Sequence, residues 1–147
     1  MAEPLIFHAT ADGKNPTIVG SSTPLPTVSS ASSSTIGGLL TVKVATAATT
    51  NATSVKVGAG RLYGWHFANV ALSTRVIRFY DKASAPTVGT DVPLFVIVIP
   101  TLQTVDHAAM IGRTFTNGIA YSVTAAVADL DATATAVNDV LGSFMYA

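Results

Sequence analysis

The residues of this 147-residue chain best suited to chemistry are its three histidines and the aspartate beside one of them. His8, His66 and His107 lie far apart and share no metal-ligand spacing such as HxH or HExxH. Asp106 precedes His107, but adjacency in sequence does not orient a carboxylate toward an imidazole as a catalytic triad requires. No serine lies in a G-x-S-x-G turn. We therefore predict neither a metal site nor a nucleophilic centre, and expect His66 to be a hydrogen-bonded core or interface residue.

The carboxylates give no stronger indication of catalysis. Glu3 is the single glutamate, so no glutamate pair exists for glycoside hydrolysis. Asp129 and Asp131 could bind a cation such as calcium, but they lack the glycine and glutamate of a known calcium loop and lie in an Ala- and Thr-rich stretch. No phosphate-binding or dinucleotide-binding glycine pattern is present, and the chain contains no cysteine. The sequence predicts a protein that is not an enzyme and has no cofactor.

A basic, aromatic cluster is the nearest approach to a nucleic-acid site. Arg61, Arg75 and Arg78 lie close to Tyr63 and Trp65 in the sequence. Arg75 and Arg78 have opposite strand parity, so we expect them on opposite faces, and the formal net charge of the chain is zero. We predict no nucleic-acid partner. The two aromatic residues could bind carbohydrate, but core packing is their more common role.

Charge is scarce and unevenly distributed. Only 11% of the residues are charged, well below the usual quarter, which favours a surface that packs against other proteins at little desolvation cost. A neutral, Thr-rich β-protein would have the same composition. Basic residues dominate between Asp12 and Asp81, whereas acidic residues dominate from Asp81 onward. Either early and late strands lie side by side and their charges mix, or the basic face of one copy contacts the acidic face of another.

The elements that must position these residues are short β-strands. Aromatic, β-branched and alternating runs between turn signals predict about seven to nine strands and no convincing helix. The strand-like runs are 42–44, 55–57, 61–70, 74–80, 94–99, 113–116, 118–127 and 139–146. Asn117-Gly118 marks a tight turn or a bulged strand, and 128–137 a weakly helical or looped connection. The fold class is therefore all-β, a β-sandwich or jelly roll.

Two of these runs carry more detailed expectations. The continuous apolar run at 94–99, bracketed by Pro93 and Pro100, predicts a strand buried on both faces. The run at 61–70 predicts a central strand with an apolar residue set on each face. One set is aromatic: Tyr63, Trp65 and Phe67. The other set is Leu62, Gly64, His66 and Ala68.

The first 38 residues differ in texture from the rest. Residues 15–42 carry no charged side chain. Within them, residues 20–38 are rich in Pro and Ser. Scattered apolar side chains favour an extended arm over residues 1–38 that lies on its own domain or on a neighbour, followed by a β-sandwich domain over 39–147; a floppy linker is the alternative. The candidate interface residues of this arm are Leu5, Ile6, Phe7, Ile18, Val19, Leu25, Val28 and Ile36.

The sequence gives no indication of membrane insertion or secretion. The start, Met-Ala-Glu-Pro, lacks the basic and apolar regions of a signal peptide. The longest strongly apolar run is about eight residues, too short to cross a bilayer as a helix. We expect no membrane partner, and expect the chain to be made in a cytoplasm-like compartment.

The run GRLYGWHFANVALSTRVIRFYDKASAPTVGTDVPLFVIVIP, residues 60–100, resembles small structural proteins of tailed bacteriophages. The shared texture is a G-x-L-Y-G strand, a turn after Asn, a second strand ending R-F-Y-D-K, a loop A-x-x-P-x-V-G-T-D-x-P and an apolar strand ending in Pro. The later T-N-G-I-A-Y-S-V-T and the tail F-M-Y-A are similar too. The resemblance covers residues 60–147, so the N-terminal arm lies outside it.

This resemblance implies a non-enzymatic virion protein that binds other virion proteins through its surface. The arm suits a capsid decoration, or cement, protein that binds the major capsid protein as a homo-oligomer, with a trimer favoured. Its expected location is the capsid surface of the virion, after assembly in the host cytoplasm. A tail, baseplate or fibre component and a carbohydrate-binding β-sandwich module are the alternatives.

Overall fold

The computed structural model describes residues 38–147, which form eight β-strands and no helix. The prediction of an all-β fold is confirmed. The strands are β1 (Leu40–Ala45), β2 (Thr53–Val57), β3 (Gly60–Asn69), β4 (Arg75–Asp81), β5 (Phe95–Ile99), β6 (Thr104–Phe115), β7 (Gly118–Thr124) and β8 (Val140–Tyr146). The division into an arm and a domain at residues 38 and 39 stays a prediction.

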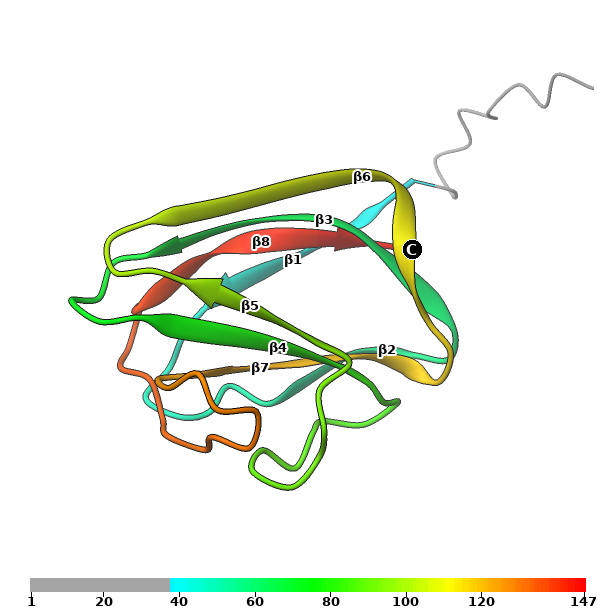
Figure 1. Cartoon of the computed structure of the whole chain (residues 1–147). Coiled ribbons are helices and arrows are strands. Elements are labelled where there is room, and N and C mark those ends of the chain that lie inside the picture. The colour runs from blue at the N-terminus through cyan, green and yellow to red at the C-terminus, as the bar shows by residue number, and fades with distance from the viewer. Residues whose placement is uncertain (1–37) are drawn as a thin grey trace, which may run out of the picture. The chain divides into compact units, whose positions relative to one another are not determined.

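The strands form two four-stranded antiparallel sheets. Sheet A has the order β1-β8-β3-β6, and sheet B has the order β2-β7-β4-β5. Figure 1 shows the two sheets as two layers. The hydrogen-bonded pairs are nested along the chain, since β1 pairs with β8, β2 with β7, β3 with β6, and β4 with β5. Eight strands with this nesting form a jelly roll, which decides between the two architectures that the sequence left open.

The core lies between the sheets and is rich in aromatic rings. Phe79 of sheet B is central: its ring lies 5.0 Å from that of Phe95 and 5.2 Å from that of Phe144 on sheet A. Such pairs add about 0.5–1.5 kcal/mol each beyond the burial of their area. The buried cluster comprises Val44, Leu62, Phe67, Ile77, Phe79, Ile97, Ile99, Phe115, Ile119, Tyr121, Val123, Val140 and Phe144.

The face expected for Leu62 in β3 is wrong. Leu62 is buried in the same core cluster as Phe67. Side chains five positions apart in a regular strand point to opposite faces, so the two should not share the core. The register of β3 against both β6 and β8 shifts between Leu62 and Gly64, so a bulge reverses the alternation there. Gly64, His66 and Ala68 do point outward as a set, and β3 is a central strand as predicted.

The apolar run at 94–99 is a strand, but the prediction that both its faces are buried is wrong. β5 is an edge strand of sheet B, and Val98 is exposed. An edge strand bounded by prolines explains the sequence equally well.

The sequence predicts only the end of β6, and most of this strand was missed. Residues 104–112 include Ala108, Ala109 and Gly112, which have low β-propensity. β6 is an edge strand of sheet A.

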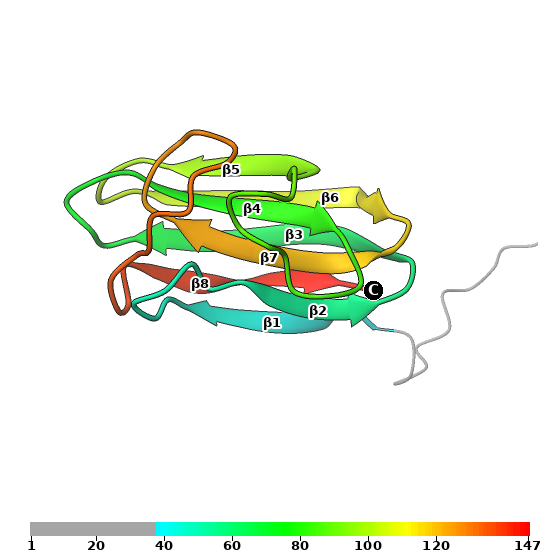
Figure 2. The same cartoon turned by 90° about the horizontal axis from the view of Figure 1, so that it is seen from below.

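Two loops cover the outer face of sheet B. Residues 82–94 and 125–139 cross in front of this sheet in Figure 2. Every residue of β7 is buried, as are the five central residues of β4. The stretch at 128–137, expected as a helix or loop, is a loop. The two inner strands of sheet B, β4 and β7, are therefore buried on both faces, whereas sheet A carries exposed residues on its outer face.

Candidate functional site

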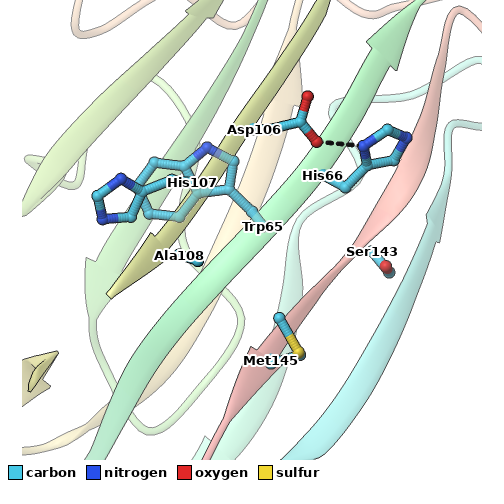
Figure 3. A pocket seen from close by; sticks show the side chains of 7 residues that line it. All are labelled: Trp65, His66, Asp106, His107, Ala108, Ser143 and Met145. Carbon is cyan, nitrogen blue, oxygen red and sulfur yellow. Dashed lines mark hydrogen bonds and ion pairs between the residues drawn. The ribbon is translucent and has the colours of Figure 1, made fainter. Parts of the chain in front are cut away.

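The outer face of sheet A brings together residues that are far apart in the sequence. Strand register places His66 on β3 between Asp106 on β6 and Ser143 on β8. Nδ1 of His66 and Oδ1 of Asp106 form a hydrogen-bonded pair whose side chains are 62% and 64% exposed. Figure 3 shows the two side chains turned toward each other. His66 is thus hydrogen-bonded, as expected, but it lies on an open face and not in the core.

A shallow hollow of about 380 Å³ lies at this pair. Its lining residues are Trp65, His66, Asp106, His107, Ala108, Ser143 and Met145. The register puts Gly64 between Met145 and Ala108, so the row next to His66 lacks a side chain at its middle. A Cβ at Gly64 would lie 2.6 Å from the carbonyl oxygen of His107, which leaves no room for a larger residue.

A row of aspartate, histidine and serine invites comparison with a hydrolase triad. A working triad needs the serine oxygen on the free imidazole nitrogen and N–H donors directed at the developing oxyanion. In the part of the chain that the structure describes, Ser143 forms no hydrogen bond with His66, and the strand N–H groups around them belong to the sheet ladders. The row can bind a hydrogen-bonding group, but its geometry assigns no nucleophile.

The second histidine of this region faces the other way. His107 stacks on Trp65 with 4.5 Å between ring centroids, and the indole also contacts the ring of Phe95 at 6.0 Å. A sugar stacking on Trp65 would have to displace His107. Among residues 38–147 no group of three or more potential ligands is placed to hold a metal ion, and His8 lies outside this range.

The two arginines of β4 have separate tasks inside the fold. Arg78 is fully buried on the outer side of sheet B, where its guanidinium donates to the hydroxyl of Thr124 and to the carbonyls of Ala126 and Ala128. Arg75 donates to Asp139 at 2.7 Å. They lie on opposite faces, as their parity predicted. Neither guanidinium is available to a phosphate backbone, which leaves Arg61 as the exposed arginine of the three in the described chain.

The Arg75–Asp139 pair also bears on the uneven charge of the sequence. Arg75 comes from the basic part and Asp139 from the acidic part, and both side chains are only 12% exposed. This pair supports the first interpretation, in which early and late strands lie side by side and their charges mix.

Three aspartates fix the loops of this fold. Burial raises the pKa of Asp139, but the N–H of Ala136 and the Arg75 guanidinium outweigh it and hold the pKa below its ordinary value. Burial also opposes ionisation of Asp131, yet hydrogen bonds from Thr133 and from the N–H of Ala126 lower its pKa.

Asp91 does the same for the other loop. Hydrogen bonds from Lys82 and from the N–H of Thr87 lower its pKa. The ionised carboxylates of Asp131 and Asp139 thus hold the 125–139 loop in place, and that of Asp91 holds the 82–94 loop. All three aspartates stabilise loops and lie apart from the hollow on sheet A.

One end of the jelly roll exposes apolar residues on rigid turns. Leu72, in the β3–β4 turn, is 86% exposed, and Leu102, in the β5–β6 turn, is 59% exposed. Buried Asn69 joins the two turns: its side-chain amide donates to the carbonyls of Ser73, Ile99 and Pro100, and its oxygen accepts from the N–H of Ala71. Leu102 has a φ of 53°, a strained value for leucine. We name this surface the apolar end, formed by Val70, Leu72 and Leu102.

Sequence reasoning did not find the apolar end or the His66–Asp106 pair. The expected strands at 61–70 and 74–80 imply a turn between them, but nothing local indicates that it meets the turn at 100–103. The eight interface residues predicted in the arm, Leu5, Ile6, Phe7, Ile18, Val19, Leu25, Val28 and Ile36, lie outside the described residues.

Comparisons with known proteins assign no family. No family model matches the chain, and no curated protein matches it. Among solved structures, the coat protein of tobacco streak virus aligns with a TM-score of 0.32 and 15% identity, over 72% of this chain and 84% of that one. A likeness of that size carries no argument about function. Within residues 38–147 no helix is long and apolar enough to cross a membrane.

Proposed function

We propose that this chain is a non-enzymatic structural protein of a virion, specifically a capsid decoration (cement) protein that binds and stabilises a lattice of the major capsid protein. The observation that carries the proposal is the apolar end. Leu72 and Leu102 project from turns that Asn69 holds in place. Exposed leucines on rigid turns bind a partner surface at little cost in ordering entropy, which is what a docking protein needs.

The fold and the sequence support the same role from other directions. Jelly rolls occur in viral capsids, in lectins and in cupins, so the fold admits the role without selecting it. The resemblance of residues 60–147 to tailed-phage structural proteins narrows that choice to a virion. The scarcity of charge lowers the desolvation cost of lying flat on a protein lattice.

The arm completes the proposal. Residues 1–38 would reach over neighbouring subunits of the capsid and bind through the eight apolar residues identified in the sequence. The protein would act as a homo-oligomer, with a trimer favoured, on the capsid surface after assembly in the host cytoplasm. Because a lattice repeats each contact many times, weak single interfaces suffice through multivalency.

Cryo-electron microscopy of intact virions that contain the protein tests its location directly. Density for the jelly roll on the capsid surface is the expected result. Density on the tail, baseplate or a fibre would overturn the decoration role and favour the alternative virion component, which would use the same apolar surfaces on a tube or a receptor.

Binding of purified protein to undecorated capsids tests the surfaces. We expect deletion of residues 1–38 to leave a folded β-domain that has lost capsid attachment or oligomerisation. Leu72→Asp and Leu102→Asp should each weaken attachment about tenfold, because a carboxylate at a buried contact must be desolvated. Val92→Asp, a comparably exposed site in the 82–94 loop at the other end, is the matched control. Unchanged attachment in the truncated and aspartate variants would reject these roles.

A carbohydrate-binding module is the second candidate, because Trp65 lies beside the hollow. Its indole is already stacked on His107, which weighs against it. A glycan array would decide: strong binding that disappears in a folded Trp65→Ala variant favours the module, and absence of binding removes it.

A further inference from the structure

The outward residues of sheet A form three cross-strand rows, read in the order β1, β8, β3, β6. Each row is fixed by backbone register. The central row is Lys43, Ser143, His66 and Asp106. The row on one side is Thr41, Met145, Gly64 and Ala108. The row on the other side is Ala45, Leu141, Ala68 and Thr104.

The two inner strands alternate in side-chain size, and their alternations are opposite. Along β8 the outward residues are large, small and large: Leu141, Ser143 and Met145. Along β3 the residues in the same rows are small, large and small: Ala68, His66 and Gly64. Each large residue therefore has a small neighbour in its row, and the hollow of about 380 Å³ is one result of that pattern.

We propose that this face packs against the same face of a second copy of the chain, forming an isologous dimer. A two-fold axis that lies in the interface, runs parallel to the strands and passes between β8 and β3 keeps every row and reverses its order. It places β8 of one copy over β3 of the other. Met145, whose methyl group lies beside Gly64 of its own chain, then faces the partner's Gly64, and Leu141 covers the partner's Ala68.

The same operation makes the charges complementary. Reversal of the central row places Lys43 opposite the partner's Asp106, at both ends of the interface. Ser143 lies opposite the partner's His66, where a hydroxyl can hydrogen bond to the imidazole. A single choice of axis thus matches side-chain size in the inner strands and charge in the outer strands, which favours a second copy as the occupant of this face.

Sheet twist leaves these contacts in place. Stacked sheets keep their strand directions within about 30° of each other. The inner strands lie only about 2.4 Å from the axis, half the strand spacing, so twist hardly moves their pairs. The outer pair lies about 7 Å from the axis, where twist shifts it by roughly one residue, and the long lysine side chain spans that shift.

The size of the face sets the strength of the dimer. Four strands at about 4.8 Å spacing and about six residues at 3.3 Å give roughly 400 Å² a copy, or about 800 Å² in total. This is below the usual range of stable interfaces, about 1,200–2,000 Å². The dimer should therefore be weak, with a dissociation constant in the micromolar range and a clear dependence on concentration.

Sedimentation velocity of the full chain over a wide concentration range is the test. A monomer–dimer equilibrium is expected. Lys43→Glu and Asp106→Lys should each weaken it about tenfold or more, because each change converts two attractive contacts into two repulsive ones. The double variant should restore the dimer. Lys43 and Asp106 of one chain lie three strands apart, about 14 Å, so restoration reports a contact between copies.

Two further variants make the result specific. Ala68→Arg fills the space under Leu141 of the second copy and should abolish the dimer, while its unfolding midpoint shows that the monomer still folds. Lys56→Glu reverses a charge on sheet B and should leave the dimer unchanged. A chain that stays monomeric at all concentrations, or a dimer that the charge reversals do not weaken, overturns the proposal.

The inference does not depend on the proposed virion role. An isologous contact is complete with two copies and cannot by itself build a trimer. A three-copy species insensitive to the changes at 43 and 106 would overturn the pairing and leave the decoration role standing. A charge-sensitive dimer that does not attach to capsids would support the pairing and count against decoration.

Discussion

The two outer faces of this jelly roll differ in what covers them. On sheet B two outward side chains of β4 are large and polar and find partners within the fold: Arg78 donates to carbonyls of the 125–139 loop, and the hydroxyl of Tyr80 contacts that of Ser122. On sheet A the outward side chains are mostly small, and its exposed residues include Leu141 and Met145. Loops of the described chain cover one face, and the other face is exposed.

The difference follows from connection length. The loops that leave sheet B, 82–94 and 125–139, are long enough to fold back over it, whereas the turns 70–74 and 100–103 are short and pass directly between strands. Long loops bring carboxylates and carbonyls that pair with buried polar groups. A sheet face without such loops stays bare, and small outward residues keep it flat enough for another surface to approach closely.

The largest expected effect tests what holds sheet A together. A Cβ at Gly142 would lie 2.0 Å from the carbonyl oxygen of His66 on β3. Gly142→Ala should force β8 away from β3 and cost about 4 kcal/mol or more in the free energy of unfolding. Urea denaturation measures this. Gly38→Ala, where a Cβ meets open space, should change stability by less than about 0.5 kcal/mol. Equal effects in both variants would contradict the close approach.

The next effect tests how sheet B is covered. Arg78→Ala removes hydrogen bonds to Thr124, Ala126 and Ala128 and leaves a cavity, so we expect a loss of about 3 kcal/mol. Lys43→Ala on the open face of sheet A should change the stability of the monomer by less than about 0.5 kcal/mol. Both values come from denaturant unfolding at low protein concentration. If the two variants were equally stable, the contrast between the faces would fail.

A smaller effect concerns the turns that join the two sheets at the apolar end. Asn69→Ala breaks the hydrogen bonds between the β3–β4 turn and the β5–β6 turn, and should cost about 2 kcal/mol. Hydrogen exchange should show faster opening of residues 70–74 and 100–103. Asn117→Ala, at an exposed turn of the other end, is the control. Unaltered exchange in both turns of the Asn69 variant would show that the apolar end is not held by this residue.

The smallest effect is the pH dependence of the loops over sheet B. The pKa values of Asp91, Asp131 and Asp139 are lower in the folded chain than their ordinary value of 3.8. Their contribution to stability is therefore fully present above pH 3.8 and is lost as pH falls through the folded pKa values. Urea midpoints should be steady between pH 5 and pH 7 by this term and fall in stronger acid. Asp131→Asn should reduce the fall of the urea midpoint in acid. An unchanged dependence of the midpoint on pH would count against a stabilising role of the ionised Asp131.

Local sequence predicted the strands well where side chains themselves favour extended backbone. The aromatic and β-branched runs that became β3, β4 and β8 were found to within about one residue at each end. β6 was largely missed, because alanine and glycine carry no such preference and only pairing with β3 makes them a strand. The face of Leu62 was wrong because a bulge is visible only in the register with neighbours. The arm and its apolar residues stay a prediction.

The candidate surfaces depended on tertiary structure almost entirely. The row Lys43, Ser143, His66 and Asp106 draws on four strands, and its members are separated by as many as 100 residues along the chain. By itself, the sequence determined that the chain is all-β, where its main turns lie and that it lacks the motifs of known catalysis. These features follow from local backbone preference and from residue type. Strand order, register and the covering of one sheet but not the other arise from contacts between distant segments, and only the folded chain decides them.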